Sequence, residues 1–530
     1  MTRRHPTPLA LRLLLLASLS ACGERGPLDL ILEGGTVVDG TGAPGVRGDV
    51  GVLGDRIAAV GDLSDVQATR RIDATGLVVA PGFIDPHTHT RAHIRDIPTA
   101  DPFILQGVTT LIEGNDGGSP VPLGPFLDSV AAAGPAPNFA MFIGHGSVRE
   151  AVMGTADRAP TPDELDRMKA LVAEGMQQGA LGLSTGLAYV PGNYATTEEV
   201  VELARVAASY GGIYISHMRD EGAGVLESVR ETIRIGQEAD IPVQMTHHKV
   251  GGHRQWGLSE ESIRLMGEAR ARGIDVTFDQ YPYTASQTGL GFIVPAWARA
   301  GDSLRVRLAD PEQGSLIREG MLAFIEERFA DDPARIQLVS CDFDSTLVGM
   351  TLADVLDREG RPKTADAIAD LVLEFDDLGR CGAILHSYDE GDVERLLRSE
   401  YGMIGSDGSL VPFGEGSPHP RGYGTYARVL GRYVRERGVV SLEEAIRRMT
   451  SAPAARLGFA ERGRIVEGMV ADLVAFDPEE IADRASFQEP HRYAVGVQVV
   501  LVAGEPVVED GRATGARPGR ILHGPGRMGG

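Results

Sequence analysis

Two histidines at positions 87 and 89 give the sequence its first recognisable chemistry. They stand one residue apart in PGFIDPHTHT, directly after a short apolar run. In an extended strand the side chains of residues i and i+2 point to the same face, so His87 and His89 project together, with Asp85 on the same side. Imidazole nitrogens and carboxylate oxygens are ligands for zinc and similar divalent ions. The stretch therefore predicts half of a metal site, unless the histidines only border a turn.

Similar side chains follow several later apolar runs. A single histidine at a strand end is more often a hydrogen-bonded structural residue than a ligand, and an Asp-Gly pair favours a turn. At successive strand ends, however, such residues converge on one edge of a sheet and supply a coherent ligand set. The residues placed in this way are His87, His89, Glu113, Asp116, His145, His217, His247, His248 and Asp407.

The apolar runs that carry these residues are short and nearly continuous, as buried parallel strands are, for example at residues 241–248. Helical patterns alternate with them, as at residues 161–179, and several begin with Thr or Ser and end with Gly. The alternation predicts a (β/α)8 barrel over residues 81–455, with active groups at the carboxyl ends of its strands. Residues from about 286 to 400 break the alternation and predict an insertion before the last barrel strand.

Both ends of the chain read as short alternating strands separated by Gly-rich turns. This pattern covers residues 28–80 and returns over residues 456–515. Strands of this kind at both termini predict one small β-sandwich domain built from the two ends of the chain.

The first residues form an export signal. Arg3 and Arg4 precede an apolar stretch that is too short to span a bilayer. Its end, Leu-Ser-Ala-Cys22, resembles the lipobox of bacterial lipoproteins, which implies cleavage before Cys22 and acylation of that residue. The alternative is a plain secretory signal with a chance cysteine. We expect residues 1–22 to be a lipoprotein signal, and the protein to be lipid-anchored at the outer membrane, facing the periplasm.

Composition narrows the classes of partner. The chain of 530 residues has 51 basic and 74 acidic residues, with a net charge of −23. Charge-driven binding to nucleic acid or to an anionic membrane surface needs clustered Lys and Arg, so we expect neither. Besides Cys22, the sequence contains Cys341 and Cys381, which could pair in an oxidising compartment or serve as small buried apolar residues.

Several longer motifs resemble one enzyme family. They include GVTTLIEGNDGGSP, GALGLSTGLAYVPGNYA, ISHMRDE, DQYPYTAS, IGSDG and HPRGYGT, and the similarity runs from about residue 28 to residue 478. Together with APGFIDPHTHT they resemble the amidohydrolase superfamily, and ISHMRDE with HPRGYGT resembles its N-acyl-D-amino-acid deacylases (D-aminoacylases). The resemblance implies a (β/α)8 barrel with a small β-domain and one or two zinc ions. It also implies hydrolysis of the amide bond of N-acyl-D-amino acids to a carboxylate and a free D-amino acid.

The resemblance also assigns roles to residues of this chain. His217 and His247 would bind the main zinc, and His87 and His89 the weaker or optional one. Asp407 would be the general base that takes a proton from a water activated by the metal, and would then protonate the departing amine. On an extended strand His248 points away from the face of its neighbour, so it ranks second as a ligand.

One position departs from the family. D-aminoacylases carry GNCG with a ligating cysteine, whereas this chain has GNDG with Asp116 in its place. A carboxylated lysine is nearly excluded, because only Lys249 among the lysines stands beside the histidines. The replacement ligand is then Asp116, at the aligned position, or Glu113, the longer side chain within the strand. Oxygen is a harder donor than thiolate, so Mn, Co or Fe are alternatives to zinc.

A small-molecule N-acyl amino acid needs a cation for its α-carboxylate. Arg219 and Lys249 each stand two residues after a metal histidine and share its strand face if the chain stays extended. The alternative for Arg219 is a surface ion pair with Asp220 or Glu221. The expected substrate-binding residues are Arg219, Lys249, Tyr281, Tyr283 and His145.

The same residues leave other functions open. The barrel could hydrolyse a cyclic amide of the hydantoin or dihydroorotate type, or a D- or isoaspartyl dipeptide, or it could be a non-catalytic lipoprotein. Five histidines away from the strand ends are expected to be structural or exposed, and His386 has no assigned place. The five are His93, His253, His419, His491 and His523.

Overall fold

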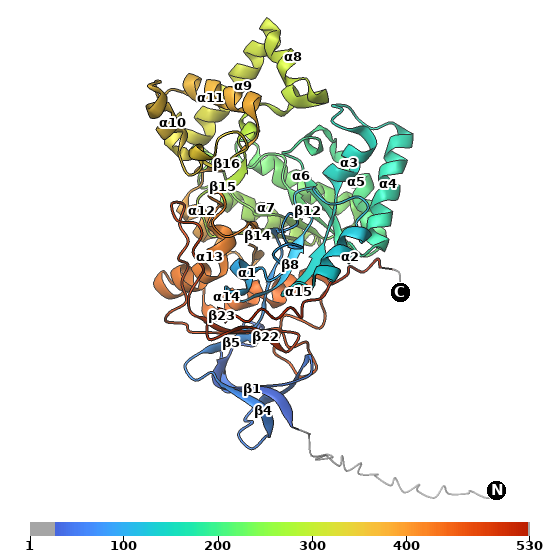
Figure 1. The fold of residues 1–530 in the computed structure, drawn as a ribbon. Helices are drawn as coiled ribbons and strands as arrows, with labels where there is room; N and C mark the ends of the chain where they lie inside the picture. The colour runs from blue at the N-terminus through green and yellow to red at the C-terminus, as the bar shows by residue number, and fades with distance from the viewer. Residues whose placement is uncertain (1–26, 528–530) are drawn as a thin grey trace, which may run out of the picture.

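The structure is a computed structural model that describes residues 27–527. The predicted signal segment and Cys22 lie outside the described residues. Figure 1 shows a β-sheet with β1, β4 and β5 at the bottom, a barrel surrounded by helices above it, and a largely helical unit at the top. Within residues 27–527, no helix is long and apolar enough to cross a membrane.

Parallel strand pairings close the barrel. β6 pairs with β8 and β8 with β9, β10 to β14 pair in chain order, β14 pairs with β18, and β19 pairs with β7. Because β6 and β7, β9 and β10, and β18 and β19 follow one another closely, these segments make eight strand positions, as the (β/α)8 barrel requires. The segments are β6 (Phe83–Asp85), β7 (Thr88–His89), β8 (Val108–Glu113), β9 (Asn138–Met141), β10 (Ile143–Gly144), β11 (Gly182–Gly186), β12 (Ile213–His217), β13 (Val243–Met245), β14 (Val276–Gln280), β18 (Gly402–Ile404) and β19 (Gly408–Ser409).

The barrel helices begin where the sequence places capping residues. Thr161 accepts a hydrogen bond from the Glu164 amide at the start of α4, and Met168, Val172 and Met176 of this helix are buried at four-residue spacing. Full burial of such side chains contributes about 1.5–3 kcal/mol each. The helices are α1 (Asp101–Ile104), α2 (Gly124–Ala133), α3 (His145–Met153), α4 (Pro162–Gln177), α5 (Thr197–Ser209), α6 (Val225–Ala239), α7 (Ser259–Ala271), α12 (Glu390–Arg398), α13 (Arg421–Arg428), α14 (Leu442–Met449) and α15 (Ser451–Leu457).

Strands from the two ends of the chain form one hydrogen-bonded sheet. The central pairings join β5 of the N-terminal part to β20 of the C-terminal part, antiparallel from Val78 to Pro81. The two-layer sandwich expected from the sequence stays a prediction. The strands are β1 (Leu28–Val37), β2 (Val46–Leu53), β3 (Arg56–Gly61), β4 (Ala68–Asp73), β5 (Val78–Pro81), β20 (Leu473–Phe476), β21 (Val497–Val502), β22 (Glu505–Glu509) and β23 (Arg512–Ala513).

The segment between β14 and α12 forms a unit with its own apolar core, which includes Ile317, Met321 and Leu338. A disulfide joins Cys341 to Cys381 across two of its strands. The last strand of the unit ends at residue 385, whereas the sequence predicted an insertion up to about residue 400. The next helix, α12, lies against the barrel, since its Asp392 accepts a hydrogen bond from Ser259 of the barrel helix α7. Its elements are β15 (Ser286–Gly289), α8 (Leu304–Ala309), α9 (Pro311–Phe329), β16 (Ile336–Cys341), α10 (Leu352–Glu359), α11 (Ala365–Leu378) and β17 (Cys381–Leu385).

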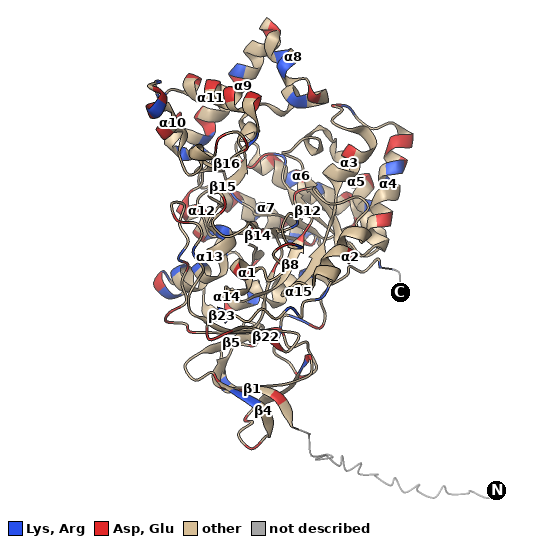
Figure 2. Cartoon of the chain, viewed as in Figure 1, with Lys and Arg blue, Asp and Glu red and all other residues tan. Residues whose placement is uncertain are grey.

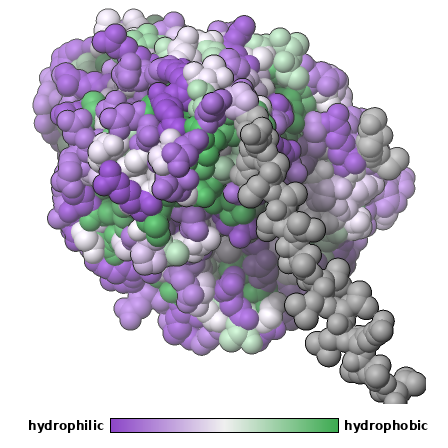
Figure 3. Space-filling model, turned by 90° about the horizontal axis from the view of Figure 1, so that it is seen from below, coloured by the Kyte–Doolittle hydropathy of each residue, from purple (hydrophilic) through white to green (hydrophobic). Residues whose placement is uncertain are grey.

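Charged residues are frequent on the outer helices, where Figure 2 shows acidic and basic residues interspersed on α4, α9 and α10. Seen from the side of the terminal sheet, the surface carries hydrophobic patches between hydrophilic ones (Figure 3). Exposed apolar residues of this part include Val46, Leu53 and Val466. The large apolar clusters instead fill the barrel and the inserted unit.

Candidate active site

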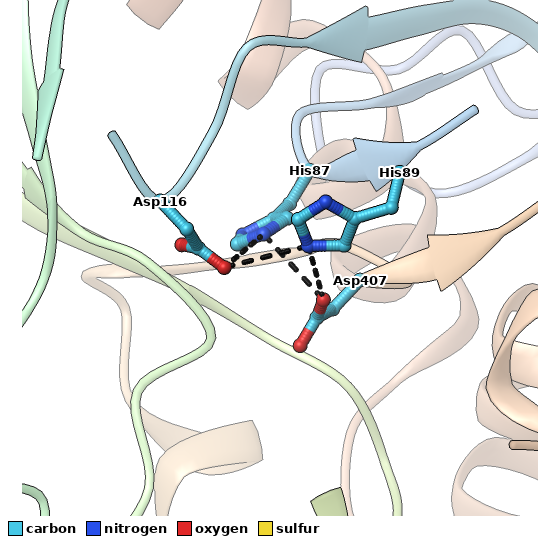
Figure 4. A group of neighbouring side chains, drawn as sticks. All are labelled: His87, His89, Asp116 and Asp407. Atoms are coloured by element: carbon cyan, nitrogen blue, oxygen red, sulfur yellow. Dashed lines mark ion pairs between the residues drawn. The ribbon is translucent and has the colours of Figure 1, made fainter. Parts of the chain in front are cut away.

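Three predicted ligands and the predicted base meet at the carboxyl end of the barrel. His87 and His89 extend from β7 and its approach, Asp407 precedes β19, and Asp116 follows β8 (Figure 4). Nε2 of His89 lies 3.0 Å from Oδ1 of Asp407 and 3.4 Å from Oδ2 of Asp116. Nε2 of His87 lies 3.5 Å and 3.6 Å from the same two oxygens. The direct pairing of β7 with β19 brings the histidines and Asp407 together.

Asp116 also belongs to a second group with His217 and His247. Its Oδ1 lies 3.4 Å from Nε2 of His247, and its Oδ2 lies 3.8 Å from Nδ1 of His217. One carboxylate therefore faces both pairs of histidines, and its position between them suits a ligand shared by two ions.

The backbone at three of these residues is left-handed. Asp116, His247 and Asp407 have φ values of 55°, 34° and 51°. Non-glycine residues in this region cost about 1–3 kcal/mol each and concentrate at functional sites, where the surrounding fold enforces them. At Asp116 this conformation turns the carboxylate out of the strand direction and into the barrel mouth.

The charges of the site favour a cation. Burial alone would raise the pKa of Asp407, but Arg421, His87 and His89 lower it below its ordinary value. Burial would lower the pKa of His89, but Asp116 and Asp407 outweigh it and raise this pKa to about 9. The buried carboxylate of Asp407 and the partly buried one of Asp116 thus attract positive charge to the centre of the site.

The ligand atoms fit a divalent metal ion. In each of the two groups the potential ligand atoms lie within 4.8 Å of one another. Both ring nitrogens of His87 and Nδ1 of His217 are buried without a hydrogen-bond partner, which is costly unless another group binds them. Four imidazoles and two carboxylates are a nitrogen and oxygen donor set that suits zinc, manganese, cobalt or iron.

Further side chains support the histidines from behind. Oδ1 of Asp279 lies 3.5 Å from Nδ1 of His87 and accepts a hydrogen bond from the His247 amide at 2.8 Å. Oε1 of Glu221 lies 3.2 Å from Nδ1 of His247, and Glu221 also lies 3.8 Å from His217. Carboxylates in such positions fix the ring orientation of metal-binding histidines. The sequence reasoning assigned no supporting role to either residue, although both stand within the quoted motifs DQYPYTAS and ISHMRDE.

Lys249 lies at the metal centre, but it is already paired. Its Nζ lies 2.7 Å from Oε1 of Glu221 and 2.7 Å from Nδ1 of His247, and it is 8% exposed. It also lines the main cavity. A salt bridge of this kind balances the Glu221 charge beside the histidines.

Glu113, the alternative ligand, lies outside both metal groups. Its Oε2 accepts hydrogen bonds from the amides of Thr90 and Arg91, and its Oε1 accepts one from Gly114. As the last residue of β8, it holds the loop that follows His89. Both oxygens are engaged, so the structure favours Asp116 over Glu113.

Two expected substrate-binding residues are engaged elsewhere. Arg219 pairs with Glu231 at 2.8 Å and donates to the carbonyls of Asn193 and Ala195, because the chain leaves the extended conformation after His217. Arg219 still lines the main cavity, but its hydrogen bonds hold the loop that contains Asn193 and Ala195. His145 begins α3 and contacts Glu199 at 2.9 Å, outside the main cavity.

Arg421 is a cation at the site that the sequence reasoning did not identify. It lies 2.7 Å from Oδ2 of Asp407, is 3% exposed and lines the cavity. Its guanidinium lies 4.6 Å from the ring centre of Tyr281, whose hydroxyl is buried. Tyr281 and Tyr283 both line a second, much smaller cavity next to the site. Arg421 belongs to the motif HPRGYGT, which the sequence reasoning quoted. It was not named as a site residue because it stands beyond the end of the last barrel strand, and only strand ends were searched.

Three further histidines have structural surroundings. His248 contacts Ser262 at 2.6 Å, on the side away from the ligands. His419 accepts from the Arg421 amide and lies 2.9 Å from the Ala285 carbonyl, so it helps to hold the arginine. His386 packs with its ring centre 4.7 Å from that of Phe487.

Comparisons with known proteins agree with this geometry. The sequence pattern of the amidohydrolase family matches residues 70–279 and 386–508. D-aminoacylase of Alcaligenes xylosoxydans xylosoxydans is 41% identical over 519 residues, which cover 94% of this chain and 98% of that protein. The chain belongs to the amidohydrolase family. Its place there is among the N-acyl-D-amino-acid deacylases. The amidohydrolase match skips residues 280–385, which correspond to the inserted unit.

Three more relatives define the branch of the amidohydrolase family. N-acyl-D-glutamate deacylase of the same organism is 36% identical, over 93% of this chain and 96% of that protein. A solved D-aminoacylase structure has a TM-score of 0.80 at 40% identity and covers 94% of this chain and all of that one. N-acyl-D-glutamate deacylase from Bordetella bronchiseptica, solved with zinc and a phosphonate mimic of the tetrahedral intermediate, has a TM-score of 0.80 at 34% identity over 94% and 100% of the two chains.

Proposed function

We propose that the protein hydrolyses the amide bond of N-acyl-D-amino acids and releases a carboxylate and a free D-amino acid. The observation that carries this proposal is the contact of Asp407 with both His89 and Arg421. Through these contacts the proposed base, Asp407, lies beside a proposed metal ligand and beside the proposed cation for the substrate carboxylate. The relatives named as D-aminoacylase and N-acyl-D-glutamate deacylase support the same reaction.

Asp116, His217 and His247 would hold one ion, and His87 and His89 with Asp116 a second. We propose zinc, with manganese, cobalt or iron as alternatives, because the donors are nitrogen and oxygen. When bound, such an ion supplies positive charge that polarises the amide carbonyl and makes a nearby water more acidic.

Residues of the chain perform the proton transfers and hold the substrate. Asp407 takes a proton from the attacking water and later gives it to the departing amine. Arg421, beside it, binds the α-carboxylate of the substrate, since its planar group matches a carboxylate with two hydrogen bonds. Binding of the carboxylate next to the base would place the scissile amide within reach of Asp407.

The charges of the cavity favour a neutral D-residue. Each Arg and Lys that lines the cavity in the described part of the chain has a carboxylate partner. Arg299 pairs with Asp376 at 2.6 Å, and Arg328 pairs with Asp220 at 3.1 Å. With Arg421 taken by the α-carboxylate, a second substrate carboxylate would have to compete with these partners for a cation.

The test is a substrate panel after metal reconstitution. It contains N-acetyl-D- and N-acetyl-L-amino acids, N-acetyl-D-glutamate, a hydantoin, and an isoaspartyl dipeptide. Hydrolysis of neutral N-acetyl-D-amino acids supports the proposal. Turnover of the hydantoin or dipeptide alone would replace it with one of those activities, and tight metal binding without any hydrolysis would indicate a non-catalytic lipoprotein.

We also propose that the protein is exported and lipid-anchored through Cys22, at the outer membrane facing the periplasm. The lipobox-like sequence supports this, and so does the Cys341–Cys381 disulfide, because such bonds persist mainly in oxidising compartments. Cys22→Ala tests the anchor. The variant should leave the membrane fraction, and a variant that stays there would contradict the proposal.

A further inference from the structure

His419 links the proposed carboxylate-binding residue Arg421 to the segment that follows β14. Its Nδ1 accepts a hydrogen bond from the Arg421 amide at 3.1 Å, and its Nε2 lies 2.9 Å from the Ala285 carbonyl. Its own amide donates to Oε1 of Gln287 in β15 at 2.7 Å. His419 is buried, with 3% of its surface exposed. Three hydrogen bonds thus join the start of α13 to the start of the inserted unit.

The partners of the His419 ring select one form of the imidazole. A backbone amide can only donate, so Nδ1 carries no proton, and a carbonyl can only accept, so Nε2 carries one. Burial and the neighbouring Arg421 hold the pKa of His419 well below its ordinary value. The ring is therefore neutral, and it adds no second positive charge beside the arginine.

The hydrogen bond to Nδ1 satisfies a backbone group at the start of α13. This helix begins at Arg421, and the first amides of a helix have no partner within the helix. Pro420, the residue before the helix, has no side-chain acceptor. His419 takes the place of a capping residue for the Arg421 amide. It thereby fixes the backbone from which the Arg421 guanidinium reaches Asp407 at 2.7 Å.

Aromatic side chains hold the His419 ring on its other sides. The ring centres of Phe487 and Tyr283 lie 5.0 Å and 5.2 Å from that of His419, both in edge-to-face arrangements. Tyr281, whose ring lies under the Arg421 guanidinium, has its centre 6.0 Å away. His419 lines neither of the two cavities of the site. It therefore acts on a substrate through Arg421 and not by direct contact.

We propose that His419 is a positioning residue that holds Arg421 in the place where the substrate carboxylate binds. This inference rests on the proposed hydrolase function and adds a residue on which its substrate affinity depends. Without the ring nitrogens, the start of α13 can shift relative to Asp407, and Arg421 no longer faces the carboxylate with both of its donors. KM for a substrate with a free carboxylate should therefore depend on His419, whereas kcat and the KM of the corresponding carboxamide should depend on it much less.

The experiment compares three variants of the zinc-loaded protein, with N-acetyl-D-leucine and N-acetyl-D-leucinamide as substrates. His419→Phe keeps a ring without nitrogens, and KM for the acid should rise at least about tenfold, since a displacement of about 1 Å can cost about 100-fold. His419→Asn should recover most of the affinity, because an Asn side chain readily accepts a hydrogen bond from the amide two residues on. His419→Gln, whose amide group lies one methylene further from the backbone, should resemble His419→Phe.

His386→Phe is the matched control. The ring centre of His386 lies 4.7 Å from that of the same Phe487, and His386 lines neither cavity. KM for the acid should be unchanged in this variant, and a rise as large as in His419→Phe would assign the effect to aromatic packing and overturn the proposal. An equal rise for the acid and the carboxamide, or a His419→Asn variant no better than His419→Gln, would also overturn it. The Asn and Gln variants keep the test decisive if His419→Phe does not fold.

A binding measurement separates this inference from the proposed hydrolase function. Calorimetric titration of the zinc-loaded protein compares D-leucine, the expected product, with D-leucinamide, so that no hydrolysis is needed. Loss of D-leucine affinity in His419→Phe, with D-leucinamide affinity unchanged, supports the role of His419 even if no N-acyl-D-amino acid is hydrolysed. Equal D-leucine affinities of the protein and the variant would refute it. Hydrolysis by His419→Phe with an unchanged KM would leave only the proposed hydrolase function standing.

Discussion

Asp407→Asn removes the proposed base while preserving the shape of the side chain. Asp407 is 4% exposed, with Oδ1 3.0 Å from His89 and Oδ2 2.7 Å from Arg421. The amide of Asn keeps one oxygen that can face His89, so the metal content should persist. A general base contributes about 10²- to 10⁴-fold, so kcat for N-acetyl-D-leucine should fall at least about 100-fold.

The same substitution should lower stability, because it leaves Arg421 buried without its charged partner. Removing one partner of a buried ion pair lowers stability by about 3–5 kcal/mol. A substrate carboxylate bound to Arg421 should restore part of the lost stability. Elemental analysis, kcat and the thermal midpoint with and without N-acetyl-D-leucine measure these effects. Asp483→Asn is the control, since Asp483 pairs with Arg428 at 2.9 Å outside the cavity lining. Full turnover by metal-loaded Asp407→Asn would refute the assignment of the base.

Four further predictions follow from the structure. Asp116→Ala should reduce the zinc content per chain, measured by elemental analysis. It should also weaken the affinity for zinc by more than the roughly 10- to 100-fold that a residue supporting a ligand typically contributes. Unchanged zinc content would exclude Asp116 as a ligand. Arg421→Ala should raise KM for N-acetyl-D-leucine at least about 30-fold, because loss of a buried charge partner costs about 2–5 kcal/mol. The KM for N-acetyl-D-leucinamide, which lacks the α-carboxylate, should change little. An equal rise in KM for both compounds would argue against a contact between Arg421 and the carboxylate. Asp376→Asn should free Arg299 and raise kcat/KM for N-acetyl-D-glutamate relative to N-acetyl-D-leucine, and an unchanged ratio would show that Arg299 does not reach the substrate. Burial would raise the pKa of Glu199, but its contacts with His145 and Arg149 lower it below 4.5. The Glu199 charge therefore stabilises the fold above about pH 4.5, and this contribution is lost as the pH falls below that value. In thermal melts Glu199→Gln should flatten the acid side of the stability profile, and an unchanged profile would contradict this.

The sequence predicted the barrel well because its strands and helices carry strong local signals. Buried strands read as continuous apolar runs, and helices such as α4 begin at capping residues like Thr161. The same signals located the strand ends, where His87, His89, His217 and His247 converge. The apolar periodicity was less informative in the inserted unit, so its end was placed beyond residue 385.

Side-chain directions after the strand ends were harder to predict. Arg219 was expected to share the face of His217, but β12 ends at that histidine and the chain turns, so the arginine meets Glu231 instead. Glu113 and Asp116 could not be ranked because the positive φ at Asp116 depends on tertiary packing. Arg421 lies far along the chain from the other site residues, and only the closed barrel brings it to Asp407.

The central claim is that this site cleaves N-acyl-D-amino acids with the help of a bound divalent ion. The most direct measurement incubates the zinc-reconstituted protein with racemic N-acetyl-leucine and follows free leucine by chiral chromatography, with a chelated sample in parallel. The account predicts that D-leucine accumulates in the zinc-loaded sample only. Release of L-leucine at the same rate, or equal release after chelation has removed the metal, would contradict it.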